Sequence, residues 1–277
     1  MQVGFIDYYL DEWHANNYPR MLKELTGGEV EVAYAYGQIP SPITGKTSRT
    51  WCQEKGIALC ETIEEVVEKS DVLIVLSPDN CEMHEALSRI PLKSGKRTYI
   101  DKTFTPDQAA ARRIFALAEE HGTPCYSTSA LRFATEYRDL LGQDIRAIST
   151  VGPYDMETYG IHQLEPIMML MGGRVRRALA LGQGKWAQVT LEWADGRCAA
   201  LLCTGNGNTP FSATVQAGEK SVSLQVNSDS FAGFMESLVR FFRTGEIPVS
   251  HEETIAIMAA REAAIRALAV PGQWVEA

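Results

Sequence analysis

The sequence has no long apolar run, no basic tract and no closely spaced cysteine pair. No stretch approaches the ~18 consecutive apolar residues that a membrane span needs, so we expect no membrane partner. The 26 Lys and Arg stand against 35 Asp and Glu, giving a net charge of −9. This balance argues against nucleic acid as a partner, because phosphate contacts require a basic surface.

The six cysteines form no C-x-x-C motif, and several, such as Cys60 and Cys203, lie in apolar segments. The N-terminus runs directly into a strand-like segment and lacks the basic and apolar regions of a secretion signal. We therefore expect reduced core thiols and a cytoplasmic protein.

Strand-like and helix-like segments alternate through the first part of the chain. This alternation predicts right-handed βαβ units and a doubly wound, parallel, Rossmann-like sheet in an α/β domain over residues 1–128. Expected strands are residues 3–6, 30–36, 57–60, 71–76, 97–100 and 124–127, and expected helices are 19–25, 48–55, 63–69, 81–88 and 106–121. The regular part of the first helix is expected to begin at Pro19, since proline is favoured at the first helical position.

The pattern then changes to β-rich runs separated by turn sequences. It predicts an α+β domain over residues 129–277 with a mainly antiparallel open sheet. Expected strands are residues 145–151, 178–181, 186–192, 198–203, 212–216 and 221–226, and expected helices are 160–171, 230–244 and 252–268. Apolar alternation along these strands makes the sheet a natural surface for self-association.

One strand of the first domain ends in an acid and a lysine, Asp101 and Lys102. Ligands bind beyond the carboxyl ends of strands in doubly wound sheets. Lys102 is therefore a candidate site residue, with a solvated lysine at a strand end as the alternative.

Several motifs resemble the Gfo/Idh/MocA family, the glucose–fructose oxidoreductase and inositol dehydrogenase type, over nearly the whole chain. The family has a Thr-Pro-Asn/Asp turn, a helix beginning near a histidine, a Glu-Lys-Pro motif and a Gly-Ile-His-x-x-Asp motif. The corresponding residues here are Ser77-Pro78-Asp79-Asn80, His84, Asp101-Lys102-Thr103 and Gly160-Ile161-His162-Gln163-Leu164-Glu165.

The resemblance implies an NAD- or NADP-dependent oxidoreductase acting on the CH–OH group of a sugar-like or polyol substrate. His162 would be the general base, since histidine titrates near neutrality, and Lys102 would polarise the same oxygen and contact the cofactor. For His162 the alternative is a helix-face histidine hydrogen-bonded within the protein. The family's catalytic aspartate, four residues before the histidine, is replaced by Thr158.

The resemblance also assigns cofactor contacts, although the loop after the first strand lacks the glycines of a dinucleotide fingerprint. Asp7 and Tyr9 stand at the first two glycine positions. No acid for the ribose follows the second strand, and Lys46 and Arg49 are the cations available to a 2′-phosphate. The cofactor-binding candidates are Ile6, Asp7, Tyr8, Tyr9, Ser77, Pro78, Asp79, His84, Asp101 and Lys102.

Two alternatives follow from these departures. The chain is either an oxidoreductase with an altered cofactor loop, or a non-catalytic relative that binds a small molecule or a protein partner. The polar and aromatic residues 7–17 then form a binding surface or simply cover the sheet edge. Asp11, Glu12 and His14 specify a metal only poorly, and we expect none. Relatives commonly form dimers or tetramers through the second domain's sheet, which implies a homo-oligomer here.

Overall fold

The computed structural model describes residues 1–277, and the chain forms two compact units. The first unit comprises Met1–Thr105, Ala109–Ser127 and Met235–Ser250. The second comprises Pro106–Gln108, Thr128–Phe234 and His251–Ala277. Residues Met235–Ser250 therefore return to the N-terminal unit, a connection that the sequence pattern did not indicate.

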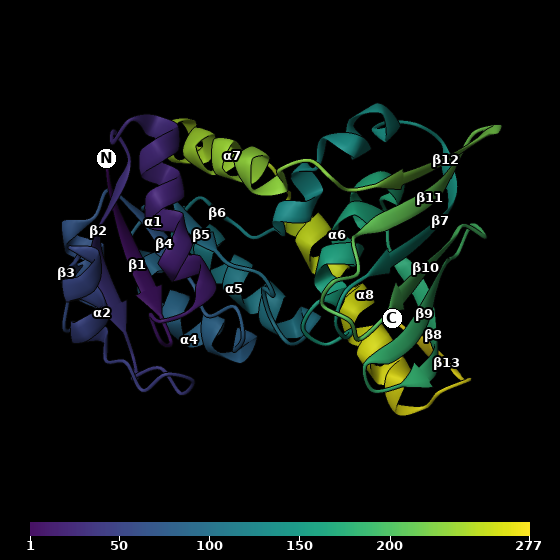
Figure 1. Cartoon of the computed structure of the whole chain (residues 1–277), viewed down its shortest axis with the longest axis horizontal. Coiled ribbons are helices and arrows are strands. Elements are labelled where there is room, and N and C mark those ends of the chain that lie inside the picture. Colours follow the sequence, from purple (N-terminus) through teal and green to yellow (C-terminus); the bar gives the residue numbers. More distant parts are fainter. The chain divides into compact units, whose positions relative to one another are not determined.

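The first unit is built on a six-stranded parallel sheet in the order β3-β2-β1-β4-β5-β6 (Figure 1). This arrangement confirms the predicted doubly wound sheet, and every residue of β4 is buried, as its apolar sequence predicts. The strands are β1 (Gln2–Asp7), β2 (Glu31–Gly37), β3 (Ala58–Leu59), β4 (Val72–Val75), β5 (Thr98–Ile100) and β6 (Cys125–Tyr126). The helices are α1 (Trp13–Thr26), α2 (Ser48–Lys55), α3 (Ile63–Lys69), α4 (His84–Ser88) and α5 (Gln108–Glu120), with short 3₁₀ turns η1 (Cys81–Met83) and η2 (Pro91–Lys93).

Gly4 in β1 allows α3 to pack directly on the sheet. A Cβ at this position would lie 2.3 Å from Ser70 Oγ and 2.5 Å from Val66 Cγ1. A larger residue would therefore push α3 away from the central strand.

The first helix begins earlier than expected. The prediction that regular helix starts at Pro19 was wrong, because α1 begins at Trp13 and contains Pro19 in its interior. Proline lacks an N–H and removes one helical hydrogen bond there. The start is fixed instead by Glu12, whose side chain caps the helix.

The second unit is built on a seven-stranded sheet in the order β12-β11-β7-β10-β9-β8-β13 (Figure 1). β7 and β10 pair in parallel, which was not predicted, and the other neighbours are antiparallel, which confirms the predicted mainly antiparallel sheet. The strands are β7 (Ile145–Gly152), β8 (Val175–Gln183), β9 (Trp186–Trp193), β10 (Cys198–Cys203), β11 (Ser212–Ala217), β12 (Lys220–Gln225) and β13 (Trp274–Glu276).

Helices α6 (Gly160–Met171) and α8 (His251–Ala269) pack against this sheet. In β9, alternate residues from Ala187 to Trp193 are buried, so one face of the sheet carries the core. Two 3₁₀ segments, η3 (Ala130–Phe133) and η4 (Thr135–Leu140), precede β7, and α7 (Ser230–Thr244) precedes α8.

The six cysteines form no disulfide bonds. Burial raises the pKa of the Cys52 and Cys203 thiols to about 11. Separately, none of the helices combines the length and the apolar character that crossing a membrane requires.

Candidate functional site

The parallel sheet brings polar segments together at one edge. Asp7 ends β1, Ser77 closely follows β4, and Asp101 follows β5. β1, β4 and β5 are neighbours in that order, so their carboxyl ends share an edge, which is where ligands bind in doubly wound sheets. Ile6, one residue before Asp7, is fully buried in the core.

The N-terminus of α1 is capped by a carboxylate from the chain itself. Glu12 has extended backbone angles, φ −133° and ψ 172°, and its side chain accepts hydrogen bonds from the amides of His14 and Ala15. The bond from His14 N to Oε2 measures 2.6 Å. A negative charge at this end is favourable, because a helix N-terminus carries partial positive charge and unsatisfied amides.

Behind this cap lies a buried cluster that contains two further carboxylates. Nδ1 of His14 lies 3.1 Å from Glu12 Oε2 and 3.5 Å from Asp101 Oδ2. The hydroxyl of Tyr99 donates to Asp101 Oδ1 at 3.0 Å. Asp7 and Asp101 are both 0% exposed, so this polar cluster is shielded from water. Nδ1 of His14 is thus within reach of the carboxylates of both Glu12 and Asp101.

Asp7 is the least satisfied member of the cluster. Neither of its carboxylate oxygens has a hydrogen-bond partner of good geometry. Burial raises the pKa of Asp7 well above its ordinary value, and the charges of Glu12 and Asp101 raise it further. The amides of Tyr8 and Tyr9 oppose this rise without cancelling it. The folded chain therefore binds the proton of Asp7 more tightly than the unfolded chain does.

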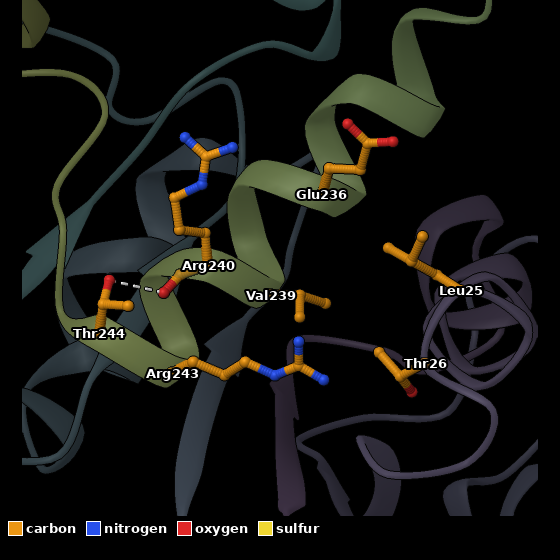
Figure 2. A pocket seen from close by; sticks show the side chains of 7 residues that line it. All are labelled: Leu25, Thr26, Glu236, Val239, Arg240, Arg243 and Thr244. Carbon is orange, nitrogen blue, oxygen red and sulfur yellow. Dashed lines mark hydrogen bonds between the residues drawn. The ribbon is translucent and has the colours of Figure 1, made fainter.

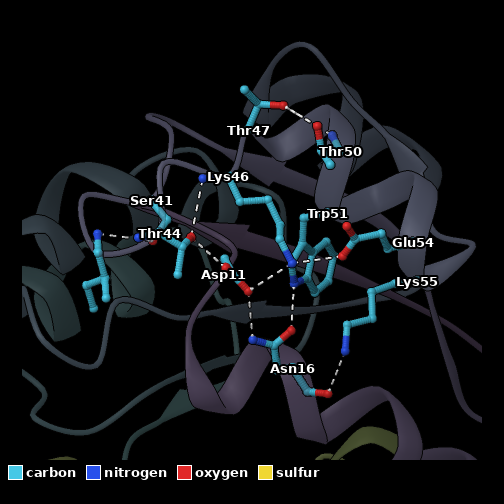
Figure 3. Close-up of polar contacts among 11 residues, drawn as sticks. Asp11, Asn16, Ser41, Thr44, Lys46, Thr47, Thr50, Trp51, Glu54 and Lys55 are labelled. Carbon is cyan, nitrogen blue, oxygen red and sulfur yellow. Dashed lines mark hydrogen bonds and ion pairs between the residues drawn. The ribbon is translucent and has the colours of Figure 1, made fainter.

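The loop after β1 is fastened to the segment that follows β2 (Figure 3). Asp11 accepts hydrogen bonds from Asn16 Nδ2 at 3.0 Å and from Thr44 Oγ1 at 2.7 Å. Asn16 in turn accepts from Trp51 Nε1 at 2.9 Å, and Lys46 Nζ lies 3.6 Å from Asp11. These contacts satisfy the loop's polar side chains within the protein.

The turn after β4 also meets this loop. Ser77 has φ 103°, an unusual left-handed value for a residue other than glycine, and its hydroxyl donates to the carbonyl of Asn80 at 3.0 Å. The hydroxyl of Tyr9 donates to Asp79 Oδ2 at 3.0 Å. Pro78 and Tyr8 are partly exposed, and Asp79 is exposed. Of these candidates, the structure therefore brings Tyr9 and Asp79 into direct contact.

His84 and Lys102 differ in accessibility. His84 is 0% exposed, and its Nδ1 lies 2.8 Å from the carbonyl of Phe104. Burial lowers the pKa of His84, which keeps the ring neutral. A cofactor contact from this side chain stays a prediction. Lys102 is partly exposed just beyond β5, and it stays a candidate for binding an oxygen or an anion.

In the second unit, His162 lies in the first turn of α6 and is partly exposed. Its Nδ1 lies 2.6 Å from Ser129 Oγ. The rings of Tyr159 and Phe211 approach the imidazole edgewise, with centroids at 5.1 and 5.9 Å. The ring is thus held at Nδ1 and confined by aromatic neighbours, which fixes its orientation.

The segment that carries Ser129 is anchored by Glu165. This buried carboxylate accepts from Thr128 Oγ1 at 3.0 Å, from the amide of Ser129 at 3.1 Å and from Arg132 Nε at 2.8 Å. Burial raises the pKa of Glu165, and the charge of Arg132 opposes the rise. Arg132 also pairs with Glu253. From the sequence, Glu165 was identified only as a motif position, and Ser129 was not identified. The polar residues that follow β6 were the feature that could have indicated Ser129.

At the position where relatives are expected to have an aspartate, Thr158 is exposed. Both its amide and its hydroxyl donate to Asp155 Oδ1 at 2.9 Å. Asp155 therefore caps the turn that leads into α6, while Thr158 itself supplies no carboxylate.

A pocket of about 340 Å³ lies beside the ends of β2 and β3 and the start of α2, lined by residues that include Gly37, Ser48 and Arg49. The guanidinium of Arg49 pairs with Glu61 at 3.0 Å, and Lys46 pairs with Glu54 at 2.8 Å. The two cations considered for a 2′-phosphate are thus both paired with carboxylates, although the Arg49 pair is largely exposed.

A second groove, of about 310 Å³, lies between the C-terminal end of α1 and α7 (Figure 2). Leu25 and Thr26 line it from α1, and Arg240 and Arg243 line it from α7. It lies at the opposite end of α1 from Glu12 and contains none of the predicted site residues.

No protein-family model and no curated protein matches the sequence. Solved structures match over the whole chain. GenD2 from gentamicin A biosynthesis, solved in complex with NAD, is 15% identical with a TM-score of 0.80, over 100% of this chain and 96% of that one. Apo scyllo-inositol dehydrogenase from Lactobacillus casei is 13% identical with a TM-score of 0.77, over 99% and 97%. The UDP-N-acetylglucosamine 3-dehydrogenase GnnA from Acidithiobacillus ferrooxidans is 14% identical with a TM-score of 0.77, over 97% and 98%. The chain therefore has the fold of these dehydrogenases, which confirms the predicted fold class.

The β1–α1 loop does not fit a dinucleotide pyrophosphate in this conformation. Fingerprint glycines permit close approach of the phosphates, and free amides at the helix N-terminus bind them. Here the amides of His14 and Ala15 already bond Glu12, and buried Asp7 adds a further acid. The buried ring of Tyr9 fills the position expected for the second glycine.

Proposed function

We propose that this chain is an oxidoreductase acting on the CH–OH group of a sugar-like or polyol substrate, with NAD or NADP as the hydride acceptor. The observation that carries the proposal is His162, held by Ser129 at 2.6 Å and partly exposed, within a fold shared end to end with sugar and polyol dehydrogenases. GenD2, with the same fold, was solved with NAD bound.

The chemistry assigned to this chain's own residues is proton transfer and charge stabilisation. His162 would accept the hydroxyl proton as the alcohol is oxidised, because imidazole titrates near neutral pH. Lys102 would stabilise the negative charge that develops on the oxygen. Thr158 stands where relatives are expected to have an aspartate, and its hydroxyl donates to Asp155. The proton would therefore leave His162 without the help of a carboxylate at that position.

A second function is favoured by one observation, the Glu12 cap. If the carboxylate excludes the pyrophosphate altogether, the chain is a non-catalytic relative that binds a small molecule or a protein partner. Asp101, buried behind the cap, adds to this alternative, since negative charge disfavours phosphate.

We also propose a cytoplasmic homo-dimer or tetramer, assembled through the sheet of the second unit. Its strands carry outward apolar side chains, namely Leu181, Trp186, Leu202 and Val222, which are 51%, 71%, 40% and 37% exposed. Light scattering of the wild type and of the Trp186→Glu and Leu202→Glu variants tests this. An unchanged mass in both variants would contradict association through this face.

The catalytic proposal is tested by a turnover screen of polyols, aldoses and nucleotide sugars with NAD and NADP. We expect turnover with at least one substrate, and a loss of about a hundredfold or more in Lys102→Ala and His162→Ala. Lys93→Ala and His121→Ala are the matched controls, because both side chains are exposed and lie outside the site. No turnover and no binding of either cofactor would favour the non-catalytic function.

A further inference from the structure

The amides at the start of α1 are occupied by a carboxylate of the same chain. Glu12 accepts from both His14 N and Ala15 N, and its side chain is only 2% exposed. The neighbouring helices α2 and α3 are capped differently, by the neutral hydroxyls of Thr47 and Thr62. A charged cap therefore distinguishes the one helix whose N-terminus follows the central strand.

We infer that Glu12 competes with anionic ligands for the N-terminus of α1, so that a dinucleotide can place its pyrophosphate there only after this carboxylate has left. The identity of that ligand rests on the proposed function. The competition itself rests on the geometry, because a helix N-terminus offers few unsatisfied amides and an occupied amide cannot also bind a phosphate oxygen.

The surroundings of Glu12 both hold and strain it. His14 Nδ1, at 3.1 Å from Oε2, holds the carboxylate in place. The negative charges of Glu12 and Asp101 repel a charge on Asp7, which is fully buried and has no partner for either oxygen. Departure of Glu12 would relieve this repulsion while it breaks two hydrogen bonds to amides. The anion that competes with a ligand for these amides is therefore the carboxylate of one residue, Glu12.

The test uses the full chain and its Glu12→Ser and Glu12→Gln variants. Serine is a standard cap residue whose neutral hydroxyl a phosphate oxygen can displace from the amides at less cost than the carboxylate, and glutamine keeps the size of the side chain without its charge. Glu24→Ser is the matched control, because Glu24 lies on the same helix and its side chain is 62% exposed. Binding of NADH and of inorganic pyrophosphate is measured separately by fluorescence and calorimetry, after circular dichroism has shown that each variant is folded.

We expect Glu12→Ser to bind NADH and pyrophosphate at least about tenfold more tightly than the wild type does, and Glu24→Ser to leave both affinities unchanged. Glu12→Gln should lie between the two. Equal affinity of the wild type and both Glu12 variants for NADH would overturn the inference and leave the proposed function standing. If none binds NADH but Glu12→Ser alone gains pyrophosphate binding, the inference holds and the proposed function fails. Absence of both kinds of binding in every variant would overturn both.

Discussion

The hydroxyl of Ser129 lies 2.6 Å from Nδ1 of His162, so the candidate base is oriented by a residue 33 positions earlier in the chain. Ser129 is itself fixed, since its amide donates to Glu165 and its Oγ accepts from the amide of Leu131 at 3.3 Å. A ring held at Nδ1 has a defined orientation, and so has its Nε2.

Substitution Ser129→Ala should therefore weaken catalysis without removing the base. We expect kcat to fall by about tenfold to a hundredfold, less than the loss in His162→Ala, with KM little changed. The pH dependence of kcat should shift as the imidazole loses its partner, and Ser129→Thr should restore it. NMR titration of His162 provides a direct check, and an unchanged profile in Ser129→Ala would show that the contact is only structural.

Asp7 should reduce stability at neutral pH. Its pKa is raised in the folded state, so the folded chain retains a proton that the unfolded chain releases. Its favourable contribution is fully present below the ordinary value of 3.8 and is lost as the pH rises toward the folded-state pKa. Asp7→Asn should thus raise the free energy of unfolding by about 1–3 kcal/mol at pH 7 and change it little near pH 3.

Urea unfolding at several pH values measures this difference. Asp139→Asn, at an exposed position, is the matched control and should show no such trend. If Asp7→Asn were destabilising at pH 7, the carboxylate would have to be ionised and satisfied in the folded chain.

Glu136 should stabilise the folded chain with a pH dependence opposite to that of Asp7. It accepts from Ser228 Oγ at 2.6 Å and from the amides of Asn227 and Ser228 at 2.8 and 2.9 Å. Desolvation opposes these bonds, but they lower the pKa of Glu136 to about 2. The stabilisation is present above the ordinary pKa of 4.5 and is lost as the pH falls toward 2.

Glu136→Gln should therefore cost about 1–2 kcal/mol at pH 7, a value reduced for the partial exposure of the site, and less at pH 3. Denaturant titrations at both pH values measure this. Glu219→Gln, exposed between β11 and β12, is the control. An equal cost at pH 3 and pH 7 would rule out the carboxylate's charge as the cause.

Arg132 should be needed for folding stability of the second unit. Its side chain is 8% exposed and pairs with Glu165 at 2.8 Å and with Glu253. Arg132→Ala leaves buried Glu165 without its cation, which should cost about 3–5 kcal/mol. Arg146→Ala breaks an exposed pair with Asp144 and should cost less than about 1 kcal/mol. Comparable losses in thermal melts of the two variants would contradict the buried role of Arg132.

Much of the fold could be predicted because its signals are local and periodic. The bounds of α6, α7 and β10 agree with the predicted ranges, since their apolar patterns and flanking turns are clear. β13 and the 3₁₀ segments were not predicted, because such short elements depend on distant partners such as β8. The predicted start of α1 was wrong because proline is favoured at the first position of a helix, whereas glutamate is not among the usual N-cap residues.

The sequence by itself determined the parallel and antiparallel sheets, the absence of fingerprint glycines after β1, and the candidates Lys102 and His162. The sheets and Lys102 follow from residue types and periodicity, which the chain carries in linear order, whereas His162 follows from the resemblance of its motif to that of a known family. Only the tertiary structure decided that Glu12 fills the N-terminus of α1, that Asp7 is buried beside Asp101, and that Ser129 holds His162. Such relationships depend on hydrogen-bond geometry and desolvation, which exist only once distant segments have packed.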